Sequence, residues 1–176
     1  MVNINYKIEA IDLLLQEDCI LSRMYPLIPY KHTLIEHFQT TDCQTKEDCL
    51  KLSDDALLSA GLPDLDTAKL FKKFLVMYDI KPQKLKEIDA VCKTPEEAES
   101  FRELYHLPGV KRVRTELYYR SGFRSLREIA DASPEDIIAR TAETIKSQNL
   151  DCIVPLKKEV KTHIAVAKAF TYYRAD

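Results

Sequence analysis

Glycine is scarce in this chain, with 3 glycines against 8 prolines among 176 residues. So few glycines leave little room for tight hairpin turns, bulges or phosphate-cradling loops, because those conformations need backbone angles that other residues avoid. Neither a P-loop nor a dinucleotide-binding fingerprint is present. The composition therefore favours helices and argues against the common glycine-rich nucleotide sites.

Paired cysteines, long apolar runs and a net positive charge are also missing. The five cysteines are odd in number and form no C-x-x-C pair, which is typical of reduced thiols. No apolar run approaches the roughly 18 residues that span a bilayer. The N-terminal apolar stretch carries acids and lacks a cleavage site, unlike a signal peptide. The formal net charge is -2, so no overall positive field attracts nucleic acid. From the thiols and the missing membrane and signal segments, we expect a cytoplasmic protein without membrane contact.

Two groups of side chains raise the alternative of a metal site. The first is a possible zinc set, whose spacings do not match the common zinc pairings: Cys43, Cys49, His32 and His37. The second comprises carboxylates that could hold Mg²⁺, although positions at the start of helices explain them better: Asp54, Asp55, Asp64 and Asp66. No nucleophile motif accompanies them. We therefore predict no metal, no cofactor and no enzymatic activity.

Helical periodicity dominates the rest of the chain. Apolar residues recur at three- and four-residue steps over 8–19, 66–79 and 155–173, and His163 is expected at the edge of the core. Caps announce further helices, with Thr94 opening one over 95–104, and Ser53 and Ser133 each preceding another. No convincing alternating strand is present. The sequence predicts a compact all-α fold of about ten helices.

The chain also repeats itself. Residues 43–58 align without a gap on residues 123–138, matching Ser/Thr, acidic and aliphatic positions 80 residues apart. A period near 80 is too long for a solenoid and indicates two related helical units. The predicted organisation is an N-terminal helix at 1–23, a first unit at 24–80, a connector with a helix at 81–103, and a second unit with the long final helix at 104–176.

Residues 105–130 hold the most informative pattern. Pro108-Gly109 predicts a tight turn, Val110 the start of a helix, and Gly122 its left-handed end. Ser125 is expected to cap a short second helix that ends near residue 130. The core between these helices is expected from Val113, Leu117, Phe123, Leu126 and Ile129.

This segment resembles the helix-hairpin-helix family, because Leu107-Pro-Gly-Val110 matches its hairpin and Gly122-Phe-x-Ser-Leu126 its entry into the next helix. It is most similar to the tandem helix-hairpin-helix domains of a family of unknown function, over about residues 104–138. The resemblance implies sequence-independent contact between hairpin amides and nucleic-acid phosphates. Lys111 stands where the family has its second hairpin glycine, and the first unit's hairpin, 28–31, contains no glycine, so we interpret that unit as structural.

Local charge agrees with a phosphate-binding second hairpin. Between residues 105 and 128 there are six basic residues against two acidic ones, whereas residues 41–100 carry nine lysines against thirteen acids. We predict binding of nucleic-acid backbone, with DNA the first candidate, at these residues: Gly109, Val110, Lys111, Arg112, Arg114 and Arg124. Because one hairpin is degenerate, a protein partner or a second copy of the chain would strengthen binding.

A second resemblance supports a different function. Residues 49–78 are similar to the closing helices of sterile-alpha-motif domains, which associate with themselves or with other proteins. The alternative is therefore a helical interaction or scaffold module that does not bind nucleic acid.

Overall fold

The structure, a computed structural model, describes residues 3–175 and contains no strand or sheet among them, so the all-α prediction is confirmed. Residues 1, 2 and 176 of the predicted terminal units lie outside this range. The elements in chain order are η1 (Ile8–Ala10), α1 (Ile11–Leu14), η2 (Ser22–Tyr30), α2 (Lys31–Gln39), α3 (Lys46–Lys51), α4 (Asp54–Ser59), α5 (Leu65–Leu75), α6 (Pro82–Val91), α7 (Pro95–Leu104), α8 (Arg112–Arg120), α9 (Leu126–Asp131), α10 (Pro134–Gln148) and α11 (Lys157–Tyr172). The η elements are 3₁₀ helices.

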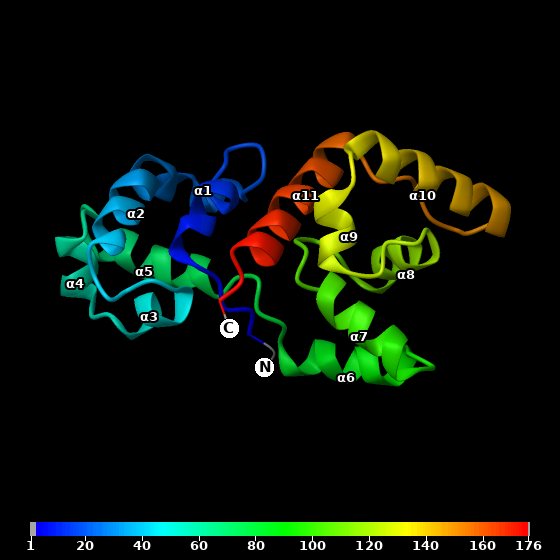
Figure 1. Cartoon of the computed structure of the whole chain (residues 1–176), viewed down its shortest axis with the longest axis horizontal. Helices are drawn as coiled ribbons and strands as arrows, with labels where there is room; N and C mark the ends of the chain where they lie inside the picture. The colour runs from blue at the N-terminus through cyan, green and yellow to red at the C-terminus, as the bar shows by residue number, and fades with distance from the viewer. Residues whose placement is uncertain (1–2, 176) are drawn as a thin grey trace.

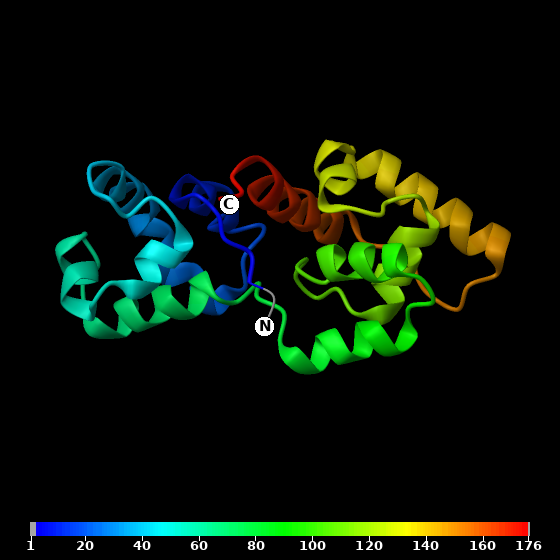
Figure 2. The ribbon, with the colours of Figure 1, turned by 60° about the horizontal axis from the view of Figure 1, so that its bottom comes forward.

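The helices form two groups that share α11. Figure 1 shows α1–α5 in one group and α6–α10 in the other, with α11 running between them, and Figure 2 shows the same division after a 60° turn. The main core joins buried residues of both groups through Val160, Ala167 and Phe170 of α11. A helix buried on more than one face needs apolar residues around most of its circumference, and α11 has them. The final helix therefore holds the two groups together.

The sequence repeat reappears in the helix boundaries. Helices α3 and α9 begin and end 80 residues apart, α4 and α10 begin 80 residues apart, and α2 and α8 match with a shift of 81. Thr45 and Ser125 each form a capping box with the acidic residue three positions later. Equivalent local signals therefore produce equivalent short helices in the two groups.

Three predicted helices are shorter than expected. The helix predicted at 8–19 consists only of η1 and α1, because the chain leaves helical geometry at Leu15 and turns back to bury Ile20. The helix predicted at 66–79 ends as α5 at Leu75, and the final helix begins at Lys157 instead of 155. Most apolar residues of these faces are buried, while Cys19, Leu70 and Met77 are half-buried, so the errors concern mainly helix length.

The connector at 81–103 contains two helices, α6 and α7, rather than one. They enclose a small core of their own, formed by Ile80, Ile88, Ala98, Phe101 and Tyr105. This core fixes α6 against α7, and α7 in turn packs against α8 within the second group. The loop between α7 and α8 carries three of the predicted binding residues, Gly109, Val110 and Lys111.

Candidate nucleic-acid interface

The hairpin loop connects α7 to α8 through two backbone turns. The amide of Leu107 donates to the carbonyl of Leu104 over 3.1 Å, and the amide of Val110 donates to the carbonyl of Leu107 over 3.2 Å. Gly109 takes a φ of 71°, the left-handed conformation that glycine adopts without strain. The predicted turn at Pro108-Gly109 is therefore present.

Val110 corrects two expectations. Helix α8 begins at Arg112, not at Val110, because Lys111 keeps an extended backbone as the N-cap residue. The Val110 side chain is buried and its amide is used within the turn, so neither is available to a phosphate. The backbone amides predicted to bind a phosphate were those from Gly109 to Lys111. Of these, the amides of Gly109 and Lys111 are still available as donors.

A buried histidine holds the hairpin against α11. Nε2 of His163 donates to the carbonyl of Pro108 over 3.0 Å, and the hydroxyl of Tyr118 donates to Nδ1 over 2.7 Å. Burial lowers the pKa of His163 to about 4, so the ring is neutral at pH 7 and can donate and accept at the same time. The sequence placed His163 near the core but gave no signal for its partners, which lie 45 and 55 residues away.

The N-terminus of α8 is open. No side chain caps it, whereas α3, α4, α5, α7, α9 and α10 are all capped by a threonine, serine or aspartate. The first amides of a helix have no partner within the helix and carry the positive end of its dipole. Lys111 and Arg112 are exposed there, and within residues 3–175 neither has a carboxylate within 4.0 Å.

Arg114 does not belong to this open end. Its Nε lies 2.9 Å from Oε1 of Glu159 on α11, a second nitrogen lies 3.3 Å from Oε2, and a third donates to the carbonyl of Ile153 over 3.0 Å. A bidentate pair of this kind fixes the guanidinium and neutralises its charge. The prediction that Arg114 contributes free charge to a phosphate site is therefore wrong, since the fold uses this side chain to join α8 to α11.

Arg124 lies beyond the opposite end of α8. Helix α8 separates it from Lys111 by nine residues, or about 13 Å of helix. Its guanidinium packs over the ring of Tyr119 at 5.0 Å, while the nearby Arg120 pairs with Glu116. The basic residues of 105–128 therefore do not converge on one patch, and Arg124 is separate from the hairpin.

Val113 departs from its predicted position. It was expected in the core between the helices, but its side chain is 61% exposed, while Leu117, Phe123, Leu126 and Ile129 are buried as predicted. Val113 borders an open cavity of about 610 Å³ between the start of α8 and the loop before α11. Ile153 and Leu156, both strongly exposed, lie in that same loop.

The first unit contains no comparable loop. Helix η2 runs directly into α2, and Nζ of Lys31 lies 3.0 Å from Oδ1 of Asp12 and donates to the carbonyls of Asp12 and Leu15. These contacts bind Lys31 into the fold.

The residues considered for metal binding do not form a cluster. Within residues 3–175, no group of three or more His, Cys, Asp or Glu side chains is arranged to hold a metal ion. Asp54 pairs with Lys72, and Asp64 caps α5 by accepting from the amide of Thr67. The Sγ atoms of Cys43 and Cys49 lie 2.9 Å apart as buried free thiols. These contacts account for the carboxylates and thiols within the fold.

Comparison with known proteins finds one family. Residues 98–170 match a domain of unknown function, DUF4332. The DUF4332 domain begins in α7 and runs through the hairpin, α8, α9 and α10 into α11, so it contains the open helix end and its His163 anchor. No curated protein and no solved structure matches the chain. In the described part of the chain, no helix combines the length and apolar character needed to cross a bilayer.

Proposed function

We propose that the chain binds nucleic-acid backbone without sequence preference and without catalysis, through the hairpin between α7 and α8. The observation that carries this proposal is the uncapped N-terminus of α8, where exposed Lys111 and Arg112 stand beside free amides. Helix N-termini of this kind bind phosphate through their amides and dipole. In this proposal residues 104–138 are a helix-hairpin-helix unit of a cytoplasmic protein, and Gly109, Lys111 and Arg112 make the contact.

Gly109 contributes by leaving space. A Cβ atom built on this residue would meet no other atom within 4 Å, so the tip of the hairpin is open to an approaching strand. Lys111, which replaces the second glycine of the family pattern, brings a flexible point charge to the same place. Because the net charge of the chain is -2, we expect weak binding, with a dissociation constant of about 10⁻⁵ M at low salt.

The test is a salt titration of the chain with a labelled duplex DNA of random sequence, followed by fluorescence anisotropy. We expect Lys111→Glu with Arg112→Glu to abolish binding near 50 mM salt. Replacing both cations by alanine instead is expected to lower the slope of log affinity against log salt by about 1.8, or 0.9 for each lost phosphate contact.

The matched control is Lys69→Glu with Lys73→Glu. These lysines are exposed on α5, far along the chain from the hairpin, and their replacement changes the net charge by the same amount. Equal loss of binding in both double variants would show that only total charge matters and would refute the hairpin site.

A second candidate function is protein binding at the same end of α8. It is favoured by the exposed apolar side chains of Val113 and Ile153, which line the 610 Å³ cavity, and by exposed Leu156 in the same loop as Ile153. We expect Ile153→Asp to abolish partner binding or self-association if this candidate is correct. Concentration-dependent sedimentation, with and without this substitution, separates it from DNA binding.

A further inference from the structure

A cavity of about 290 Å³ lies between the two helix groups, on the inner side of the hairpin. Its walls come from three places: Leu21 and Arg23 in the first group, the chain at 77–81 with Lys84 of α6, and the hairpin segment 105–109. The volume is close to the lower end of the range of about 300–1,000 Å³ that is usual for small-molecule sites.

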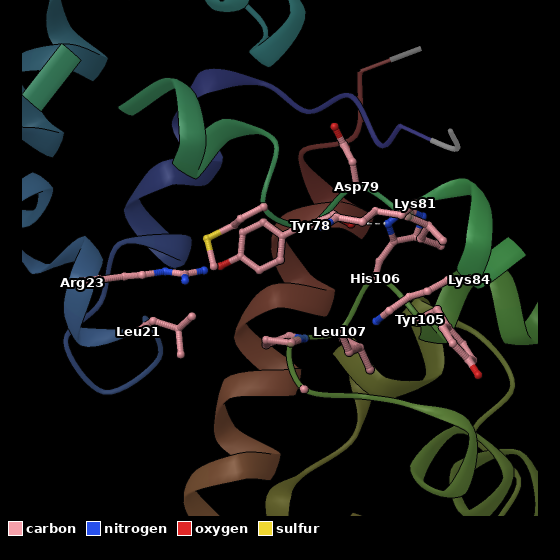
Figure 3. Close-up of a pocket in the computed structure, with 13 residues that line it drawn as sticks. Leu21, Arg23, Tyr78, Asp79, Lys81, Lys84, Tyr105, His106 and Leu107 are labelled. Carbon is pink, nitrogen blue, oxygen red and sulfur yellow. Dashed lines mark hydrogen bonds between the residues drawn. The ribbon is translucent and has the colours of Figure 1, made fainter. Parts of the chain in front are cut away.

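Three cations line this cavity without a carboxylate partner. Figure 3 shows Arg23, Lys81 and Lys84 reaching it from different sides, with Arg23 beside Tyr78 and Lys84 extending toward Leu107. Within residues 3–175, none of the three has a carboxylate within 4.0 Å. Unlike the basic residues of α8, these side chains belong to separate elements that the fold brings together.

The one carboxylate in the wall does not neutralise them. The side chain of Asp79 is 3% exposed and pairs with Lys46, itself almost fully buried. The amide of Ile4 also donates to Asp79. Asp79 therefore belongs to an internal ion pair, and the charge left facing the cavity is positive.

The start of α6 adds to this positive potential. Lys81 is the N-cap residue of this ten-residue helix, no side chain caps it, and proline occupies the first position. The positive end of the helix dipole therefore lies beside the cavity. His106 contributes no charge at neutral pH, because burial lowers its pKa despite the hydrogen bond that its Nδ1 donates to the carbonyl of Tyr78 over 2.8 Å.

The remaining walls are apolar or aromatic. Leu21, Met77 and Leu107 border the space, together with the ring of Tyr78. A bare inorganic anion would leave these surfaces unused. A molecule with one charged group and a compact organic body would bury them and at the same time meet the cations.

We infer that this cavity binds a small organophosphate, with its phosphate group between Arg23, Lys81 and Lys84 and its organic part against Tyr78, Leu21 and Leu107. A phosphate group presents three terminal oxygens, and lysine ammonium groups bind such oxygens as point charges. This inference does not depend on nucleic-acid binding, since none of these cations is part of the α8 site.

Isothermal titration calorimetry on the full chain provides the test, with four probes: AMP, ribose 5-phosphate, inorganic phosphate and adenosine. We expect at least one of the two organophosphates to bind with a dissociation constant below about 1 mM and about tenfold more tightly than inorganic phosphate or adenosine. No binding of either organophosphate at about 5 mM overturns the inference. Inorganic phosphate binding equally well overturns the role of the organic part, and adenosine binding equally well overturns that of the phosphate.

Charge-removing variants locate the site. Lys81→Ala with Lys84→Ala is expected to weaken organophosphate binding at least about tenfold, because two of the three cations are lost. Lys86→Ala removes a charge from an exposed position of the same helix that does not line the cavity, and is expected to leave binding unchanged. Equal effects of the two variants would overturn the assignment.

A further comparison separates this site from the hairpin. Lys111→Glu with Arg112→Glu is expected to leave organophosphate binding intact even though it abolishes DNA binding. Amide chemical-shift changes on adding AMP are expected at 77–84 and 105–109. Shifts confined to residues 111–114 would place the phosphate at the start of α8 and overturn the cavity site.

Discussion

Two lysines 80 residues apart show how similar helices acquire different roles. Lys31 begins α2, and Lys111 immediately precedes α8. Lys31 is bound to Asp12 and to two backbone carbonyls, whereas Lys111 is exposed and has no carboxylate partner within 4.0 Å in the described chain. The difference arises from the preceding segment: a 3₁₀ helix runs straight into α2, while a loop with Gly109 precedes α8. The preceding segment therefore decides whether the lysine is bound into the fold or left on the surface.

The two units also differ inside the core. Lys46 and Leu126 occupy the same first position of α3 and α9, and both are buried. Nζ of Lys46 pairs with Asp79 and donates to the carbonyl of Ile4 over 3.0 Å. The first unit therefore carries a buried ion pair at a position where the second unit has an aliphatic side chain.

Breaking the ion pair between Lys46 and Asp79 is expected to cause the largest loss in the free energy of unfolding. Asp79→Ala leaves the Lys46 charge buried without its partner, and removing one member of such a pair costs about 3–5 kcal/mol. Urea unfolding followed by circular dichroism measures the change in the free energy of unfolding.

The control variant replaces the ion pair of the first unit by aliphatic side chains, as at Leu126 of the second unit. Lys46→Leu combined with Asp79→Leu removes both charges, and apolar replacement of a buried pair is often neutral. We expect a loss of less than about 2 kcal/mol. A double variant as unstable as Asp79→Ala would contradict the view that the unpaired charge is the main cost.

Two buried histidines of the second unit predict that the free energy of unfolding depends on pH. His163 is buried with a pKa of about 4, against about 6.5 in an unfolded chain, and burial lowers the pKa of His106 as well. The neutral form of each ring contributes stability that is present above pH 6.5 and is lost as the pH falls below it, toward about 4 for His163. For His163 the loss is at most about 1.4 kcal/mol per pH unit.

Unfolding titrations between pH 4 and 7 test this expectation. His163→Gln keeps a donor and an acceptor but does not titrate, so we expect a flatter profile. A wild-type profile that is flat over this range would contradict the argument.

Local signals in the sequence predicted the fold well. Thr94, Ser53, Ser133 and Ser125 cap the helices assigned to them, because an N-cap acts on amides only two or three residues away. The left-handed end at Gly122 was predicted for the same reason: the amide of Phe123 donates to the carbonyl of Tyr118, five residues earlier.

The candidate site depends on contacts that sequence spacing does not contain. Arg114 has the same local surroundings as Arg112, yet only Arg114 meets Glu159, 45 residues later. Val113 has helical spacing to Leu117, but the face it occupies turns toward solvent because α8 is tilted onto α7 and α10. The number of basic residues was predictable, whereas their division between ion pairs and open surface was set by packing.

Substitutions of Arg114 and Lys111 test this division between ion pairs and open surface. Their expected effects on the free energy of unfolding are smaller. Arg114→Ala is expected to lower the free energy of unfolding by about 1–2 kcal/mol, because the bidentate pair with Glu159 is partly buried and joins two helices. Lys111→Ala, at an exposed position, is expected to change it by less than about 0.5 kcal/mol. Thermal unfolding compares the two, and equal losses would mean that Lys111 also serves the fold.

Removing the N-cap side chain from either capping box is expected to cause a similar and small loss of stability. Thr45 and Ser125 accept from the amides of Asp48 and Glu128 over 3.3 and 3.2 Å, and each acid accepts from its cap's own amide. Replacing either cap by alanine is expected to cost about 1 kcal/mol in urea unfolding, while Thr45→Ser keeps the hydroxyl and should cost little. A much larger loss at Ser125 would mean that α9 stabilises the whole molecule through α11, beyond the role that α3 plays in its own unit.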